Sequence, residues 1–260
     1  MAGGKHTPTL DEVREYWDRY TNDVEIVDQP IGSDAFFDDL ERYRYEKIDY
    51  LRSYVDFPRY RGKKVLEIGC GPGVDSLQFA RAGVQLTAVD LSPNAVEMAK
   101  MNLAREGHTA DIRVGNAEQL EFADGTFDVV YSVGVLHHTV DTQRSIDEVY
   151  RVLKPGGEAV LLLYNRRSWM VLLSKLTGTP IEHAEQEAPI VRSYTTRECR
   201  RMLSRFRELD VQVDRFPKRT VKFKGIKALL FNYGIVPLFA VLPRSMVGPL
   251  GFHILLRATK

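Results

Sequence analysis

The stretch VLEIGCGPGVD at residues 65–75 decides how the rest of the chain is interpreted. Its apolar run contains one acid, Glu67, and predicts a buried strand that is followed by a helix over 76–82. Three glycines stand at alternate positions after the run, at Gly69, Gly71 and Gly73. A glycine-lined turn between strand and helix lets a ligand lie against bare backbone, because no Cβ blocks the approach. The stretch therefore predicts a ligand-binding loop.

The spacing of the glycines indicates the kind of ligand. A dinucleotide fingerprint would place its third glycine at position 74, where this chain has Val74, and it has no acid inside the strand. Glu67 stands two residues before the first glycine and suits an ammonium group better than a pyrophosphate. An isolated Gly-x-Gly-x-Gly is often only a turn. The prediction of a ligand-binding loop therefore depends on the ordered strands that follow it.

The next strand endings carry polar residues at the expected places. An apolar strand over 86–89 ends in Asp90, about 20 residues past the loop, where a carboxylate can hold both ribose hydroxyls. A short strand over 112–115 leads into Asn116, Ala117 and Glu118, where a side-chain carbonyl and a backbone N–H can contact an adenine edge. In the alternative interpretation, Asp90 and Asn116 only cap helices.

Two further strands complete the alternating series. The fourth covers 128–132 and leads to the pair His137 and His138. The stretch LKPGG at 153–157 predicts a helix stop and turn, and 158–164 predicts a fifth strand. Alternating strands and helices predict an α/β fold with a largely parallel sheet.

With these motifs the chain resembles the class I S-adenosylmethionine (SAM)-dependent methyltransferases of the small-molecule branch, type 11-like. The resemblance covers residues 65–157 in order, through VLEIGCGPG, AVDLSP, GNAEQLEF, FDVVYSVGVLHH and EVYRVLKPGG. It implies a doubly wound, Rossmann-like sheet of seven strands in the order 3-2-1-4-5-7-6, with the last strand antiparallel. It also implies SAM as the cofactor and S-adenosylhomocysteine (SAH) as its product.

The resemblance assigns cofactor contacts to individual residues. It places Glu67 and the loop around the methionine part, Asp90 on the ribose and Leu91 on the adenine face. It also implies that Asn116 and Ala117 lie at the adenine edge. The remaining expected cofactor contacts are Tyr16, Cys70, Glu118, Ser132 and Val133.

Composition agrees with a single α/β domain. The chain has 260 residues and a net charge of +1, which gives no overall field for nucleic acid. Its two cysteines, Cys70 and Cys199, predict no disulfide and fit a reducing cytoplasm, and no metal-ligand spacing occurs. We expect lid helices in 1–58, the SAM-binding core in 59–165 and substrate-side insertions at 166–194 and 222–250. Between the two insertions we expect a helix over 196–206 and a strand over 211–221.

The segment before the core predicts two helices rich in aromatic residues. The first covers 10–21, with Thr9 as its N-cap and Glu12 at the capping-box position. The second covers 34–56. Aromatic helices before the first core strand suit a lid that excludes water from the cofactor, and equally suit a pair of helices packed on the sheet.

His138 is the candidate general base, with His137 in reserve, because both follow the strand beside the expected methyl position. The chain is also similar to phosphoethanolamine-type methyltransferases, in which a lid tyrosine pairs with the histidine of a YSxxxxxH run. Residues 131–138 match that spacing, and 19–23 resemble the tyrosine-bearing segment. The resemblance implies a Tyr20–His138 pair, and a structural role for each residue is the alternative.

The insertions bear on the methyl acceptor. Tyr164, Arg166 and Trp169 are the candidate substrate residues at the end of the fifth strand. Residues 228–242 are strongly apolar, have basic residues on both sides and are too short and interrupted to span a membrane. A peripheral membrane or dimer contact through 225–250, a roof over the pocket and simple packing on the core all remain open.

The sequence thus predicts a SAM-dependent methyltransferase that acts on a small molecule, lipophilic acceptors included, at O, N, S or C. An RNA or protein methyltransferase is one alternative, although no Asn-Pro-Pro-Tyr-like motif and no basic aromatic stripe occur. A SAM-using enzyme with other chemistry is the second.

Overall fold

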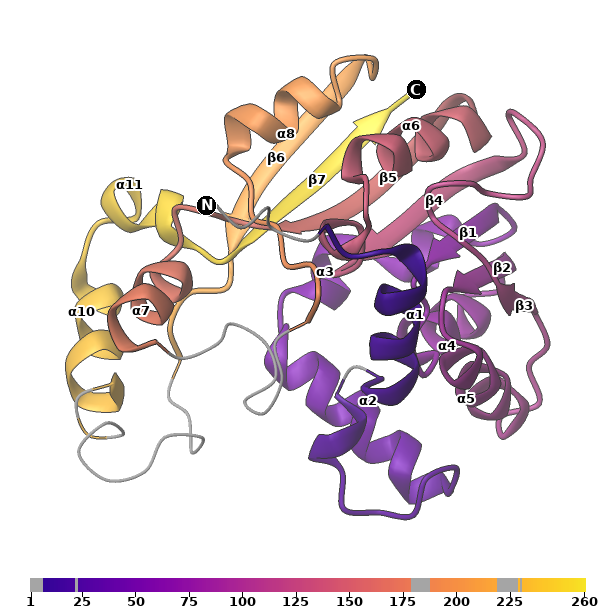
Figure 1. Cartoon of the computed structure of the whole chain (residues 1–260), viewed down its shortest axis with the longest axis horizontal. Coiled ribbons are helices and arrows are strands. Elements are labelled where there is room, and N and C mark those ends of the chain that lie inside the picture. The colour runs from indigo at the N-terminus through magenta and orange to yellow at the C-terminus, as the bar shows by residue number, and fades with distance from the viewer. Residues whose placement is uncertain (1–6, 22, 179–187, 219–228, 230) are drawn as a thin grey trace, which may run out of the picture.

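One sheet organises the protein. The computed structural model describes residues 7–21, 23–178, 188–218, 229 and 231–260. In this part of the chain seven strands are arranged in the order β3-β2-β1-β4-β5-β7-β6 (Figure 1). The strands are β1 Lys64–Ile68, β2 Gln85–Asp90, β3 Asp111–Val114, β4 Phe127–Val133, β5 Leu153–Tyr164, β6 Glu208–Asp214 and β7 His253–Thr259. Only β7 runs antiparallel to its neighbours, which confirms the predicted topology.

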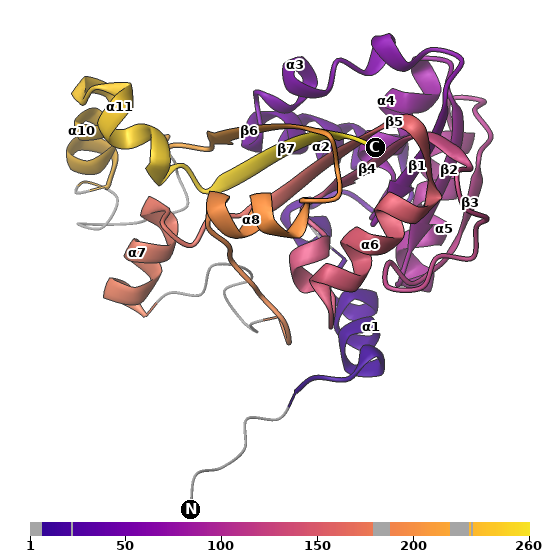
Figure 2. The same ribbon diagram turned by 90° about the horizontal axis from the view of Figure 1, so that it is seen from above.

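Helices cover both faces of the sheet, and Figure 2 shows α6 and α8 on one side with α3 and α4 on the other. The longer helices are α1 Leu10–Arg19, α2 Asp34–Lys47, α4 Val74–Arg81, α5 Pro93–Ala104, α6 Thr142–Val152, α7 Trp169–Thr177 and α8 Thr196–Met202. The shorter ones are α3 Leu51–Val55, α10 Val236–Val241 and α11 Arg244–Val247. Single turns are η1 Val24–Ile26, η2 Phe57–Tyr60, η3 Leu136–His138, η4 Phe231–Ile235 and η5 Gly248–Leu250.

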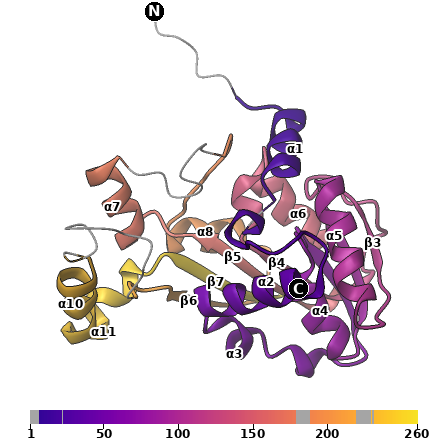
Figure 3. The same ribbon diagram turned by 90° about the horizontal axis from the view of Figure 1, so that it is seen from below.

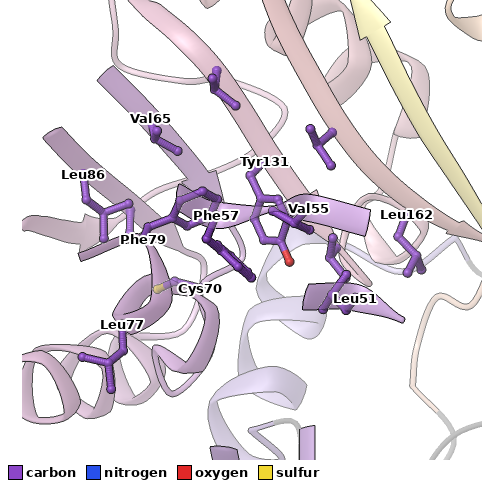
Figure 4. Close-up of a cluster of buried hydrophobic side chains, with 14 of the residues drawn as sticks. Leu51, Val55, Phe57, Val65, Cys70, Leu77, Phe79, Leu86, Tyr131 and Leu162 are labelled. Carbon is purple, nitrogen blue, oxygen red and sulfur yellow. The ribbon is translucent and has the colours of Figure 1, made fainter. Parts of the chain in front are cut away.

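Each face of the sheet has its own apolar core because successive strand residues point to opposite sides. Val65 of β1 packs with α3, α4 and α5, whereas Leu66 packs with α6 and α8. Figure 4 shows the first of these cores, in which Phe79 lies 4.8 Å from Phe57 and 5.1 Å from Tyr131 between ring centroids. Burial on both faces explains the continuous apolar run of β1.

The predicted helix over 34–56 is wrong in one respect, because the structure divides it into α2 and α3. The chain leaves helical geometry at Ile48, whose φ and ψ are −128° and 66°. The break lets the buried Ile48 side chain enter the core and brings the Tyr50 hydroxyl to His253 of β7. Tertiary contacts here override a continuous helical pattern.

Three boundaries on the carboxyl side also differ from prediction. LKPGG at 153–157 is not a simple turn but belongs to β5, opposite an irregularity in β4 near Phe127. The helix predicted to reach 206 ends at Met202. The strand predicted over 211–221 is instead Glu208–Asp214, because β7 begins opposite Asp214; residues 219–221 lie outside the described residues.

The first helix begins as expected. Glu12 N–H donates to Thr9 Oγ1 at 3.3 Å, and Thr9 N–H donates to Glu12 Oε2 at 2.7 Å. The capping box is confirmed, and it fixes the start of α1.

Candidate active site

A cavity opens at the carboxyl ends of β1, β2, β4 and β5. One part, here called the motif end, is lined by Glu67, Gly69, Cys70, Gly71, Asp90, Leu91, Asn116, Ala117 and Glu118. The other part, here called the charged end, is lined by Asp23, Arg44, Lys47, Arg215 and His253. Val133, His138 and Tyr164 also line the cavity. The structure therefore gathers most of the residues singled out in the sequence around one space.

The three loop glycines have different structural reasons. All three adopt positive φ, at +78°, +52° and +76° for Gly69, Gly71 and Gly73. A Cβ on Gly69 would lie 2.2 Å from the Val135 side chain, and one on Gly73 would lie 2.8 Å from Cα of Ala99. A Cβ on Gly71 would meet nothing within 4 Å, so only this glycine leaves its approach open on the protein side. Gly73 is absent from the cavity lining and serves the packing of α4 on α5.

Asp90 joins the loop to the second strand. Its carboxylate accepts hydrogen bonds from the N–H of Gly71 at 2.9 Å and of Ser92 at 3.0 Å. Desolvation raises the pKa of Asp90, and the backbone donors oppose that shift. The N-cap of α5 is Ser92, so Asp90 is not merely a helix cap. Asn116 does make a local bond, since its Oδ1 accepts from Glu118 N–H at 2.9 Å.

Two buried acids lie behind the loop. Glu67 is 2% exposed and accepts a short hydrogen bond from the Ser76 hydroxyl. Burial, followed by the charge of Asp75, raises the pKa of Glu67 well above its usual value. An ammonium group beside Glu67 would stabilise the ionised carboxylate and reverse this shift.

Asp75 is the hub of a buried network that sequence reasoning missed. It accepts hydrogen bonds from Arg44 Nη2 at 2.6 Å and from the hydroxyls of Tyr45 and Tyr131, both at 2.7 Å. Burial opposes ionisation of Asp75, but the Arg44 guanidinium and these donors outweigh it and lower the pKa of Asp75. Its position at the start of α4, directly after the glycine loop, was the available signal.

His138 is 5% exposed and lies where the fourth strand ends. Its Nδ1 lies 2.7 Å from the carbonyl oxygen of Ile190, which can only accept, so Nδ1 carries the hydrogen. The basic nitrogen is then Nε2. From α1, Trp17 lines the cavity and packs its ring 4.8 Å from His138. Tyr20 is not part of the lining, and its ring lies 5.1 Å from Tyr16.

Three other predicted residues also lie outside the lining. His137 is fully buried, with its ring 3.8 Å from that of Tyr164. Ser132 is fully buried and donates to the carbonyl of Ile68 at 3.0 Å. Tyr16 packs edge-on against Trp17 at 5.1 Å. These positions support the cavity wall.

The predicted substrate residues separate in the structure. Tyr164 lines the cavity. Arg166 does not: it pairs with Glu198 at 2.7 Å on the surface, where Glu198 also caps α8. Trp169 also lies outside the lining, and its indole N–H donates to the carbonyl of Arg215 at 2.9 Å. Arg166 is therefore unavailable as a pocket residue in this structure, because a surface carboxylate holds it.

Helix α1 lies against the motif end. Leu10, Val13 and Trp17 contribute to the cavity lining. Asp18 accepts from the Ser92 hydroxyl at 2.8 Å and from Asn94 N–H at 3.0 Å, at the start of α5. Figure 3 shows α1 beside α5 in the view from below, and these bonds fix that contact.

The second insertion carries many of the exposed apolar side chains of the described residues. They are Leu229, Tyr233, Leu238, Val241 and Met246, and α7 adds Leu172 and Leu176. Trp169 and Phe231 bring the two segments together, with ring centroids 5.7 Å apart. Among the described residues, no helix has both the length and the apolar character needed to cross a bilayer.

The described residues contain no metal-binding cluster, and both cysteines are free thiols. In the described ranges no group of three or more His, Cys, Asp or Glu side chains could hold a metal ion. Cys70 and Cys199 are both buried free thiols, and burial raises the pKa of each. Both thiols are therefore poor nucleophiles.

The central part of the chain is similar to known methyltransferases. Residues 66–161 match the model of a methyltransferase domain family. The ubiquinone biosynthesis O-methyltransferase of Xanthomonas oryzae pv. oryzae is 36% identical over 121 residues, which are 46% of this chain and 49% of that protein. The matched stretch thus spans about half the length of this curated relative.

Solved structures resemble nearly the whole chain. A SAM-dependent methyltransferase of Thermotoga maritima, described as a possible histamine N-methyltransferase, has a TM-score of 0.58 at 18% identity, covering 95% of this chain and 99% of that one. Phosphoethanolamine N-methyltransferase 2 of Haemonchus contortus, solved with SAM, has a TM-score of 0.61 at 19% identity, covering 95% and 60%. Residues 66–161 thus match a methyltransferase domain family, and the chain has the fold of the class I SAM-dependent methyltransferases.

Proposed function

We propose that this protein transfers a methyl group from SAM to a small molecule, lipophilic acceptors included, and releases SAH. The observation that carries the proposal is the motif end, where Glu67, the Gly71 backbone, Asp90 and Asn116 line one cavity. These groups match the parts of SAM in order along the cavity: an ammonium group, a methionine chain, a ribose and an adenine. The domain match at residues 66–161 supports the same function.

The residues present fit the cofactor chemically. The Asp90 carboxylate holds two backbone N–H donors and has acceptor capacity left for ribose hydroxyls. Leu91 and Ala117 supply apolar surface for a purine. Among the described residues Glu67 forms no ion pair, because Arg44, whose charge lowers the pKa of Glu67 only in part, is bonded to Asp75. A ligand ammonium group would supply a cationic partner.

The chemistry asks mainly for alignment. SAM supplies a methyl group on a sulfonium, which carries its own leaving group. The acceptor lone pair forms the new bond to the methyl carbon as the carbon–sulfur bond breaks and its electron pair returns to sulfur. The protein holds the two reactants in line and excludes water from them. Val13 and Trp17 of α1 line the cavity and are placed to exclude water.

His138 is the residue we propose as general base. Ile190 fixes its Nδ1–H, so Nε2 can take the proton that an O–H, S–H or N–H acceptor loses. Trp17 packs on the ring and holds its orientation. A Tyr20 contribution to this pair stays a prediction, as does a base role for His137.

Titration calorimetry of the purified protein with SAM and SAH tests the proposal, followed by turnover with methyl-labelled SAM. The acceptor panel contains phenols, thiols, amines, carboxylates and quinones. Binding of both ligands with label transfer to any member supports the function. Absence of binding to both ligands would overturn it.

Two outcomes would favour the alternatives. Binding of SAM without transfer to any small acceptor, but with transfer to RNA or protein, would identify a macromolecular methyltransferase. Consumption of SAM without methylated product would identify other SAM chemistry. The net charge of +1 argues against an RNA substrate.

We further propose a cytoplasmic protein that touches an anionic membrane surface through residues 225–250 and so reaches lipid-soluble acceptors. The support is the exposed apolar set of α7, η4 and α10 together with a run of basic residues in the sequence, Lys218, Arg219, Lys222, Lys224 and Lys227. Residues 219–228 lie outside the described residues. Co-sedimentation with phosphatidylglycerol vesicles should exceed that with phosphatidylcholine vesicles, and Leu238→Ser should reduce it. Vesicle-independent dimerisation would point to a second copy instead.

A further inference from the structure

The charged end of the cavity contains an arginine held by its own backbone. Arg215 follows β6 directly and has a φ of +64°, in the left-handed region that residues other than glycine rarely adopt. Its carbonyl accepts from the Trp169 indole N–H at 2.9 Å and from Phe252 N–H at 3.2 Å. Its guanidinium lies 5.2 Å from the centroid of the Phe252 ring. These contacts fix where the side chain enters the cavity.

The cations of the charged end differ in how they are neutralised. Arg44 bonds to Asp75 at 2.6 Å, and Lys47 bonds to Asp23 at 2.7 Å. Arg215 instead places Nη1 2.8 Å from Nε2 of His253. Within the part of the chain that the structure describes, no carboxylate forms an ion pair with the Arg215 guanidinium.

His253 cannot supply the missing negative charge. Burial, and then the charges of Arg215 and Lys47, lower the pKa of His253 well below its usual value, so its ring is neutral. Because Nε2 accepts from Arg215, the hydrogen of the ring is on Nδ1, which faces the Tyr50 hydroxyl at 2.5 Å. The neighbouring Asp214 uses Oδ1 to accept the Arg215 backbone N–H at 2.7 Å.

The sheet register gives the separation between the end of β5 and the end of β6, the strand that Arg215 follows. His253 is paired with Tyr164 of β5 on one side and with Asp214 of β6 on the other. Adjacent strands lie about 4.8 Å apart, so roughly 10 Å separates the end of β5 from the end of β6. Leu162 and Tyr164 of β5 and His253 of β7 line this part of the cavity wall. An acceptor that spans this distance would lie along an apolar and aromatic surface.

We propose that the methyl acceptor carries an anionic group, a carboxylate or a phosphate, which Arg215 binds at the charged end while its apolar body lies along Tyr164. This inference rests on the proposed function. A planar guanidinium suits both anions because it offers two parallel N–H donors. Lys47 and Arg44 line the same end and favour an anion over a neutral group there, even though each is paired with an acid.

Calorimetry on the SAH-saturated protein tests the inference with benzoate, phenyl phosphate and the neutral analogue benzamide. We expect both anions, or one of them, to bind with one site per chain, and benzamide to bind at least tenfold more weakly. Arg215→Gln should weaken anion binding at least tenfold, and Arg215→Lys should retain part of it. The matched control is Arg201→Gln, an exposed arginine of α8 outside the lining, which should change nothing.

The arms of the experiment separate the possible failures. If the unmodified protein does not bind SAH, the proposed function itself is wrong. Normal SAH binding without anion binding, equal binding of benzamide, or an anion affinity that Arg215→Gln leaves unchanged would overturn the anionic subsite alone. Preference for phenyl phosphate over benzoate would identify a phosphorylated acceptor, and the reverse preference a carboxylic acid. If Arg215→Gln unfolds, Arg215→Lys decides instead, and an anion affinity equal to that of the unmodified protein would overturn the inference.

Discussion

The two ends of the cavity are built in different ways. The motif end comes from one continuous part of the chain, residues 67–118, and presents backbone groups and side chains at the ends of neighbouring parallel strands. The charged end collects Asp23, Arg44, Lys47, Arg215 and His253 from both ends of the chain. The first lies within the residues that match the methyltransferase domain family, whereas the residues of the second lie outside that match. The difference suggests that cofactor binding and acceptor choice can be altered separately.

The largest expected effect concerns the hub between the two ends. Asp75→Ala leaves the Arg44 guanidinium buried without its partner and should lower the free energy of unfolding by about 3–5 kcal/mol. Urea denaturation measures it, with the exposed Asp111→Ala as control. Arg44→Met combined with Asp75→Leu should recover much of the loss. A loss below about 1 kcal/mol in the single variant would mean that the ion pair is not buried in solution.

Asp90→Ala should act on the motif end alone. Loss of the acceptor for two ribose hydroxyls should weaken SAH binding roughly a hundredfold, because hydrogen bonds to a charged group contribute about 1.5–3 kcal/mol each. Calorimetry gives the affinity, and Asp111→Ala again serves as control. Unchanged affinity would show that the ribose lies elsewhere.

His138→Ala should separate chemistry from binding. With an acceptor from the panel that must lose a proton, we expect kcat to fall about a hundredfold, in the range of general base catalysis, with SAH affinity within about twofold. Tyr20→Phe should have a smaller effect than Trp17→Ala, since Trp17 packs on His138 and lines the cavity. Equal loss of turnover and SAH affinity in the His138 variant would indicate a structural role.

The smallest effect is a pH dependence at Glu67. Its folded pKa is raised, so its contribution to stability is fully present below the unfolded value of 4.5 and is lost as the pH rises through the folded pKa. Glu67→Gln should therefore stabilise the ligand-free protein at pH 7 by about 1 kcal/mol, or roughly 2–4 °C in Tm, while it weakens SAM binding. Thermal melts at pH 5 and pH 8 measure this, with the exposed Glu121→Gln as control. A Glu67→Gln variant that is less stable at pH 8 would contradict the assignment.

Sequence reasoning predicted correctly that residues belonging to short local patterns lie together at one sheet edge. The loop 65–75, Asp90 and Asn116 lie within or directly after strands whose apolar runs are visible, so their place at one sheet edge follows from the topology. It failed where partners are distant. Arg44 could not be matched with Asp75, nor Arg215 with His253, because nothing in the intervening sequence records which helix or strand end meets which.

The misassigned residues have the same origin. Arg166 follows β5 at the ligand-binding edge, yet Glu198, which starts α8, holds it on the surface. Gly73 belongs to the glycine pattern, yet its reason is the close approach of Ala99. The sequence pattern thus indicates where a residue lies, whereas a contact with a residue of another element decides what that residue does.

The Asp75 network indicates that the folding unit begins before the residues that match the domain family. The domain match starts at residue 66, yet the guanidinium and one phenol that satisfy Asp75 come from Arg44 and Tyr45. A fragment trimmed to the matched residues would keep the glycine loop but expose an acid that has lost its counterion. Expression of such a minimal fragment should yield aggregated or loosely packed material, so excised or shuffled versions of this protein need to retain α2.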